Sequence, residues 1–98
     1  MFVKIHKTYR DVIAICDFDL IGKFFEEGKS QLDIKESFYK GEEKTPEEVE
    51  KLMEYMSGED ATFNIVGNES VDLALKVGII SESGVGEIQG VKFALILA

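Results

Sequence analysis

The sequence predicts an α+β domain in which a mixed β-sheet, begun by an N-terminal hairpin, carries two helices packed on one face. Three observations predict it. Short apolar runs, alternating or continuous, lie toward both ends of the chain and are typical of strands. Two amphipathic stretches with start and stop signals lie between them and indicate helices. A strand, a helix and a later apolar strand follow one another, which permits a right-handed crossover with a parallel pair at the core.

The N-terminal hairpin comes from two neighbouring runs. Apolar and polar residues alternate through residues 2–9, as in a strand with one buried face. Residues 12–16 are apolar throughout, which indicates a strand that is buried on both faces and central in the sheet. Arg10 and Asp11 separate the two runs and mark the turn.

The segment that follows the hairpin has weaker patterns. Residues 17–23 interrupt the alternation and predict a loop or one helical turn. Residues 24–25 and 31–35 predict short extended segments separated by a turn, the second an exposed strand. Residues 37–44 predict a loop that contains two large aromatic residues.

The first helix has the clearest start signal. Thr45 fits the N-cap, Pro46 fits the first helical position, and Glu48 completes a capping box. Ser57 and Gly58 end the helix. Its apolar face is formed by Val49, Leu52, Met53 and Met56.

The stretch around the second helix organises the rest of the chain. Residues 63–66 are β-formers, and Gly67 can take a left-handed conformation that reverses the backbone. Asn68 is a good N-cap, and Gly78 fits the left-handed residue that ends a helix. The helix between them has an apolar stripe of Val71, Ala74, Leu75 and Gly78.

The end of the chain returns to β-structure. Residues 81–86 predict a loop, and residues 87–89 and 91–97 predict strands, the last nearly all apolar and therefore central. The 98 residues contain no internal repeat and no linker, so we expect a single domain over residues 1–98.

Charge and composition restrict the function classes. The formal net charge of −8 argues against direct nucleic-acid binding, because affinity for a polyanion is carried by Lys and Arg. Residues 26–60 hold 12 of the 19 Asp and Glu residues against 5 Lys. The Glu-rich helix over residues 47–54 is therefore either a solvated face or an acidic docking surface for a basic protein partner.

The expected location is the cytoplasm. No apolar run approaches the roughly 18 residues of a membrane span, and no signal peptide is recognisable. A single cysteine suits a reducing compartment. Many Glu and Lys residues, with few Asn and Gln, are typical of a thermophile.

His6 and Cys16 are the only residues of their types and raise the question of a Cys–His dyad. A two-residue turn in the hairpin places them on opposite faces of the sheet, and a three-residue loop places them on the same face. The sequence leaves both registers open. The structural alternatives are an exposed strand histidine and a buried apolar cysteine.

Asp17 and Asp19 follow the central strand, where paired carboxylates can hold Mg²⁺ or transfer protons with Lys23 nearby. No third ligand stands at a recognisable spacing, so we expect no metal site and no cofactor; a turn residue and a cap explain both carboxylates equally well. The turn at Gly67 either offers backbone N–H groups to an anion or has the purely structural role of connecting the strand to the helix.

Phe38 and Tyr39 are large aromatic residues in the predicted loop that ends at Gly41. Such residues either fold back as a lid on the core or bind a partner.

Six short segments, spread nearly from end to end of the chain, together match a family pattern in order and spacing. They are Cys16-Asp17, Asp19-Leu20-Ile21-Gly22-Lys23, Phe25-Glu26-Glu27-Gly28, Ser37-Phe38-Tyr39-Lys40-Gly41-Glu42, Asn64-Ile65-Val66-Gly67 and Ile88-Gln89-Gly90-Val91. With them the chain resembles an archaeal family catalogued as domain of unknown function 424. Two departures accompany the resemblance: Lys40 stands where the family pattern has glycine, and residues 92–95 replace a more polar segment that usually includes histidine. The resemblance implies an archaeal, intracellular, single-domain protein with no established activity.

Three functional hypotheses follow. The first is a non-enzymatic protein-binding or adaptor domain, associated with archaeal translation or RNA machinery through a protein partner. The second is a small-ligand or metal-dependent enzyme that uses Asp17, Asp19 and Lys23. The third is a structural homodimer formed through a free sheet edge, with the strand over residues 31–35 as the candidate. The candidate binding residues are Asp17, Asp19, Gly22, Lys23, Phe38, Tyr39, Gly41, Asn64 and Gly67.

Overall fold

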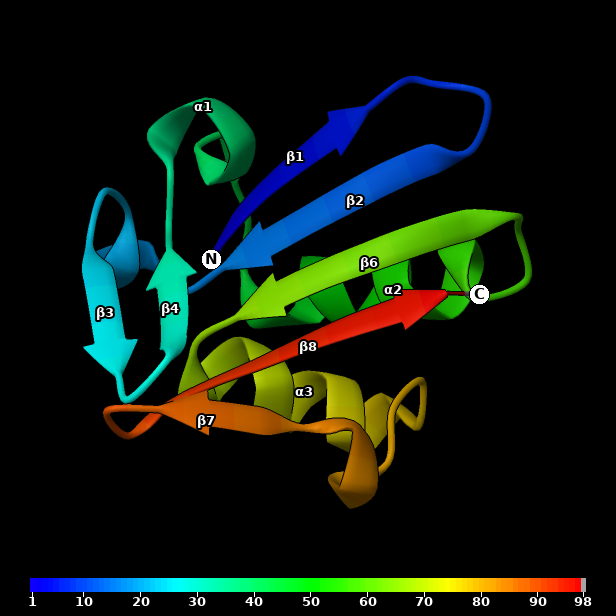
Figure 1. Ribbon diagram of the computed structural model, residues 1–98. Coiled ribbons are helices and arrows are strands. Elements are labelled where there is room, and N and C mark those ends of the chain that lie inside the picture. The colour runs from blue at the N-terminus through cyan, green and yellow to red at the C-terminus, as the bar shows by residue number, and fades with distance from the viewer. Residues whose placement is uncertain (98) are drawn as a thin grey trace.

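A six-stranded sheet forms the centre of the protein, whose computed structural model describes residues 1–97 (Figure 1). β2 and β6 are parallel, and every other neighbouring pair is antiparallel. The predicted α+β class and the N-terminal hairpin are therefore present. The parallel pair expected from a strand, a helix and a later apolar strand is not formed around α3, because β6 and β8 are antiparallel; the parallel pair is β2 and β6 instead. In spatial order the strands are β5 (Glu42–Glu43), β1 (Phe2–His6), β2 (Asp11–Cys16), β6 (Ala61–Val66), β8 (Val91–Leu97) and β7 (Gly86–Ile88).

Two helices, α2 (Pro46–Met56) and α3 (Asn68–Val77), pack on one face of this sheet. The capping box of α2 is formed as predicted: the Glu48 N–H donates to Thr45 Oγ1 at 3.2 Å, and the Thr45 N–H donates to Glu48 Oε1 at 2.9 Å. Helices of this length are marginal in water, so burial of their apolar stripes stabilises them. The core between helices and sheet includes Ile13, Ile15, Val49, Met53, Phe63, Ile65, Val71 and Ala74.

The other face of the sheet is covered at one end only. A separate hairpin of β3 (Phe24–Glu27) and β4 (Ser30–Asp33) stands beside the ends of β2 and β6, followed by the one-turn helix α1 (Glu36–Tyr39) (Figure 1). The cluster buried beneath them is formed by Ala14, Cys16, Ile34, Tyr39 and Val66.

Three local expectations need correction or refinement. The loop predicted over residues 37–44 contains α1 and the short strand β5. The strand predicted over residues 31–35 is β4, which pairs with β3 and is not an edge of the main sheet. The helical turn allowed for residues 17–23 is present as η1 (Phe18–Leu20), and a second one, η2 (Glu82–Gly84), lies in the predicted loop before β7.

Within residues 1–97, none of the helices combines the length and the apolar composition that crossing a membrane requires.

Candidate functional site

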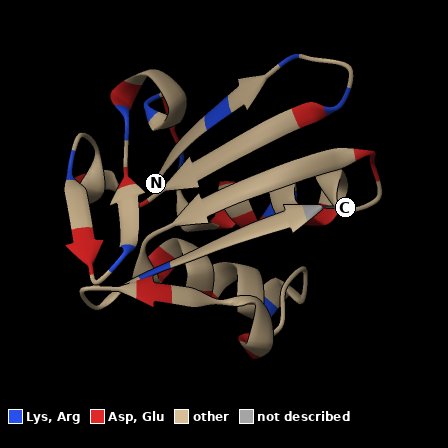
Figure 2. Ribbon diagram, in the orientation of Figure 1, with Lys and Arg blue, Asp and Glu red and all other residues tan. Residues whose placement is uncertain are grey.

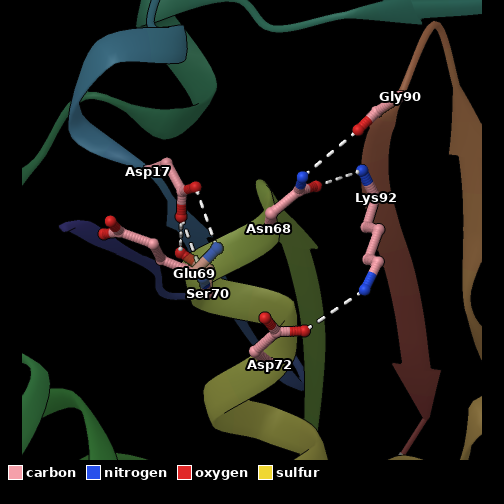
Figure 3. Close-up of polar contacts among 7 residues, drawn as sticks. All are labelled: Asp17, Asn68, Glu69, Ser70, Asp72, Gly90 and Lys92. Atoms are coloured by element: carbon pink, nitrogen blue, oxygen red, sulfur yellow. Dashed lines mark hydrogen bonds and ion pairs between the residues drawn. The ribbon is translucent and has the colours of Figure 1, made fainter.

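The junction of β2, β6 and α3 is built around the carboxylate of Asp17. Asp17 follows β2, and its N–H donates to the carbonyl of Val66 at the end of β6, at 3.0 Å. Its Oδ1 accepts from the N–H and the Oγ–H of Ser70, at 2.8 and 2.6 Å, and its Oδ2 accepts from the Glu69 N–H at 3.1 Å (Figure 3). Asp17 is only 7% exposed. The N-terminus of α3 is thus capped by a carboxylate from a distant part of the sequence, where the helix dipole favours negative charge.

Gly67 makes this approach possible. Its φ and ψ are 111° and 147°, close to a region that is essentially restricted to glycine. A Cβ built at Gly67 would overlap the carboxylate of Asp17. Its positive φ agrees with the prediction, but the turn also has to leave space for the Asp17 side chain.

Asn68 is not the N-cap that the sequence predicts. Gly67 occupies the cap position, and Asn68 is the first helical residue. The Asn68 side chain instead donates from Nδ2 to the Gly90 carbonyl at 3.2 Å and accepts at Oδ1 from the Lys92 N–H at 2.9 Å. Figure 3 shows this amide bridging α3 and β8. Because Asp17 caps the helix, the amide of Asn68 is available to hold the start of β8.

The sequence suggested an anion site at the Gly67 turn and a carboxylate site at Asp17. In the structure these are the two sides of one contact, because the Asp17 carboxylate binds the N–H groups at that turn. Both Asp17 oxygens accept hydrogen bonds from α3, and Asp19 is exposed to solvent. Among residues 1–97 no group of three or more His, Cys, Asp or Glu side chains is arranged to hold a metal ion. A hollow of about 270 Å³ beside the junction is lined by Asp17, Asp19, Leu20, Asn68, Glu69 and Val91, and its lining includes neither Lys23 nor Tyr39.

α1 is held against β1 by two side chains of that strand. Lys4 Nζ donates to the Ser37 carbonyl, and His6 Nε2 donates to the Phe38 carbonyl, both at 2.8 Å. The Phe38 ring stacks on the His6 ring with a centroid distance of 4.6 Å. Cationic or N–H-donating side chains are favourable at the C-terminal carbonyls of a helix. This contact explains why the segment forms a helical turn where the local sequence indicated a loop.

The Tyr39 side chain belongs to the second buried cluster, which it forms with Ala14, Cys16, Ile34 and Val66. It is 8% exposed, and burial, followed by the nearby Cys16, raises the pKa of its hydroxyl to about 12. Gly41 lies directly over β1, where a Cβ would overlap the carbonyl of Val3. Tyr39 therefore packs back on the core, and Gly41 permits the close passage of the chain.

The remaining candidate residues are spread over the surface. Gly22 has a φ of 81° and donates its N–H to the Ile34 carbonyl at 2.8 Å, so it forms the turn before the β3–β4 hairpin. Lys23 is exposed at the same turn. Asn64 lies half-buried on the partly covered face of the sheet, between Ala14 and Leu95. The structure brings Asp17 to Gly67, with Asp19 lining the hollow beside them, and Phe38 and Tyr39 to Gly41, but Lys23 and Asn64 join neither group.

His6 and Cys16 do not form a dyad. His6 pairs with Val12 and Cys16 pairs with Phe2, so neither register considered from the sequence is correct. The two side chains share a face of the sheet but lie at opposite ends of the hairpin. Cys16 is fully buried, and burial, followed by the charges of Asp17 and Asp19, raises the pKa of its thiol to about 12.

We expect Cys16 to resist alkylation in the folded protein at mildly alkaline pH. The thiolate is the reactive form, and both its raised pKa and its burial suppress it. Iodoacetamide labelling followed by mass spectrometry should show no adduct on the native protein and complete labelling in guanidinium chloride. Labelling of the native protein at the rate of the unfolded chain would contradict the burial of this thiol.

The sequence singled out neither Ser70 nor the actual partner of His6. Ser70 is fully buried and hydrogen-bonded to Asp17. The sequence feature that could have identified it is a hydroxyl on the otherwise apolar side of the helix. His6 donates a hydrogen bond to the Phe38 carbonyl of α1, and no pattern in the sequence around His6 predicts this partner. Both contacts join segments that are far apart in the chain.

Comparison with known proteins agrees with this architecture. A solved structure described as an uncharacterized conserved protein from Methanopyrus kandleri is 28% identical in sequence, with a TM-score of 0.81 over 98% of this chain and 90% of that one. A comparison with curated proteins gave no match. The family model described as "Protein of unknown function (DUF424)" matches residues 5–98, and the chain therefore belongs to the DUF424 family.

Proposed function

We propose that this protein is a non-enzymatic protein-binding domain whose helix side receives a basic, apolar-anchored segment of a partner. The observation that carries the proposal is an apolar hollow beside α3, lined by Glu69, Asp72 and Lys76 among others, on a helix side that is rich in carboxylates. The two helices carry Glu47, Glu48, Glu50, Glu54, Glu69 and Asp72, against the two bases Lys51 and Lys76. Figure 2 shows acidic residues recurring along both helices. Such a surface attracts and orients a cationic partner.

The hollow lies between the N-terminal ends of the two helices and has a volume of about 440 Å³. Met1, Pro46 and Leu73 form its apolar floor, with Glu69, Asp72 and the base Lys76 at the rim. An apolar side chain of the partner fits the floor, and a neighbouring Lys or Arg fits the rim, as in interfaces that combine a buried anchor with a charged border.

The bases near the hollow already have partners. Lys76 pairs with Glu50 at 3.3 Å, and Lys92 pairs with Asp72 at 3.4 Å. The ammonium group of Met1 donates to the Lys44 carbonyl at 3.1 Å. Glu47 and Glu69 are exposed and make no ion pair with any residue from 1 to 97. Glu48 and Glu54 are also exposed and in no ion pair within that range, but Glu69 lines the hollow and Glu47 follows the lining residue Pro46, so these two carboxylates are the ones offered to a basic partner at the hollow.

The side chains considered for catalysis support a binding role over an enzymatic one. Asp17 caps α3, Cys16 is a buried protonated thiol, and His6 caps α1. Each of these three is committed to a contact within the fold, whereas Asp19 and Lys23, the other residues of the enzyme hypothesis, are exposed. Archaeal translation or RNA-associated machinery, reached through such a protein partner, is the context we propose.

We expect a synthetic helical peptide of Lys and Leu to bind at this hollow, and a Lys and Ser peptide of the same charge to bind more weakly. The reason is that only the first supplies an apolar anchor for the floor. Titration of ¹⁵N-labelled protein, followed by amide shifts, should move residues 47–50 and 69–76 together. Binding should weaken as salt is raised, because screening reduces the contribution of the rim.

A matched pair of variants separates the surface from net charge alone. Glu47→Gln with Glu69→Gln should weaken binding of the Lys and Leu peptide by about tenfold, since charges at the border of an interface contribute modestly each. Glu36→Gln with Glu82→Gln removes the same charge from exposed sites off both helices and should change it little. Equal losses in both variants, or shifts centred elsewhere, would refute the proposed surface.

A further inference from the structure

The two edges of the main sheet are protected to different degrees. The β5 edge is two residues long and consists of Glu42 and Glu43, with Lys40 and Lys44 beside it. Short, charged edge strands of this kind discourage pairing with another chain. At the other edge the first residue of β7, Gly86, lies opposite Phe93, and β8 continues past it to Leu97. Within residues 1–97, β8 has no strand on its outer side beyond Phe93.

The main chain of β8 presents hydrogen-bonding groups along this free edge. The Lys92 carbonyl accepts from the Gly67 N–H at 2.8 Å, and the Lys92 N–H donates to Asn68 Oδ1 at 2.9 Å. Both groups of Lys92 therefore point toward the β6 side. Because successive residues of a strand alternate, those of Phe93 and Leu95 point outward. Phe93 meets β7, whereas the N–H and carbonyl of Leu95 lie beyond its end.

The side chains at this edge lack the usual protection. Residues 93–97 contain no charged residue, no proline and no glycine. Leu95 is 64% exposed. A neutral, apolar edge strand with free main-chain groups is a template for strand addition.

We infer that this edge pairs with the same edge of a second copy of the chain, as an antiparallel continuation of the sheet across a two-fold axis. A two-fold interface needs one self-complementary patch, and a neutral strand meets its own copy without repulsion. The surfaces on α2 and α3 are acidic, so two copies of a chain with net charge −8 repel each other there.

β7 restricts the register. If Leu95 lay opposite Leu95 of the copy, residue 97 of the copy would lie opposite Phe93, where Gly86 already stands. With Ile96 opposite Ile96 of the copy, Leu95 lies opposite residue 97 of the copy and β7 remains undisturbed. The free edge therefore fits a two-fold axis at Ile96.

A hollow with apolar and polar lining lies at the same place. On the helix side, a hollow of about 480 Å³ is lined by apolar groups of Phe63, Val77, Ile79 and Ile96, with Glu54 and Ser57 at its polar rim. Residues opposite each other on neighbouring strands place their side chains on the same face of the sheet. Ile96 of the copy therefore covers this hollow, and the pairing extends the core from one copy into the other.

The test is the oligomeric state measured by light scattering and sedimentation over a wide range of concentrations. The unaltered protein should associate to a dimer. Leu95→Lys should raise the dimer dissociation constant by about tenfold or more, because it places two cations at the paired edges. Tyr55→Lys adds the same charge at an equally exposed position, 63% exposed on α2, and should leave the dimer intact.

Two measurements make the result decisive. Far-UV circular dichroism of Leu95→Lys should match the unaltered protein, since the replaced side chain is largely in solvent. Hydrogen exchange of the Leu95 amide should slow as the protein concentration rises. A monomer at all concentrations, a dimer unaffected by Leu95→Lys, or protection at β4 instead of β8 would overturn the inference.

Discussion

Replacing Asp17 with alanine is expected to destabilise the protein by about 3 kcal/mol. The change removes three hydrogen bonds to a carboxylate and leaves the N–H groups of Glu69 and Ser70, and the Ser70 hydroxyl, without that acceptor. Ser70 is fully buried, so water replaces the lost bonds poorly. A loss of this size is a large part of the roughly 5–15 kcal/mol that stabilises an ordinary domain. Guanidinium unfolding followed by circular dichroism measures it.

Asp19 supplies the matched control for this substitution. It lies two residues further along the chain and is exposed, and Asp19→Ala should change the free energy of unfolding by less than about 0.5 kcal/mol. If the two variants lost equal stability, the cause would be the general charge of the segment, and the capping of α3 would not account for it.

The parts of the fold that the sequence predicts well depend on contacts between near neighbours. Thr45, Pro46 and Glu48 lie within four positions, so their capping box is visible before any tertiary structure is known. Gly78 ends α3 with a φ of 92° for a similarly local reason. The apolar character of β2 is also local, and it correctly places this strand inside the sheet.

The parts that the sequence does not predict depend on contacts across the chain. Asn68 is a residue type that often caps helices, but the Asp17 carboxylate accepts the hydrogen bonds at the start of α3 instead. No sequence pattern near Asp17 or near the helix predicts this contact. α1 forms because the side chains of Lys4 and His6 in β1 donate hydrogen bonds to its carbonyl groups and hold it against that strand. The hairpin register was undetermined because the residues between β1 and β2 contain no glycine to fix a turn type.

The residues that carry the family resemblance acquire physical roles from this geometry. Asp17 and Gly67 fix the start of α3, Tyr39 fills the second cluster, and Gly41 lets the chain pass over β1. These four roles concern folding. Binding is therefore better sought on surfaces that the matched residues leave free, namely the helix side and the β8 edge.

Gly67→Ala is expected to be the most damaging single substitution, at about 4 kcal/mol. Two effects add: the backbone conformation at φ 111° strains any residue with a Cβ, and that Cβ overlaps the Asp17 carboxylate. Gly78→Ala is the control, because φ there is 92° but nothing lies within 4 Å of the added Cβ. It should cost only the backbone term, about 1 kcal/mol.

The double variant Asp17→Ala with Gly67→Ala separates these two effects. Once the carboxylate is gone, the added Cβ no longer meets it, and Gly67→Ala retains only its backbone strain. The combined loss should therefore be smaller than the sum of the single losses by about 2 kcal/mol, because the two residues are in direct contact. Unfolding curves of all four proteins give this coupling energy, provided that the single variants remain folded at low temperature. Strict additivity would mean that Gly67 is required for its backbone conformation alone, and that the close approach of Asp17 to the start of α3 does not depend on the missing side chain.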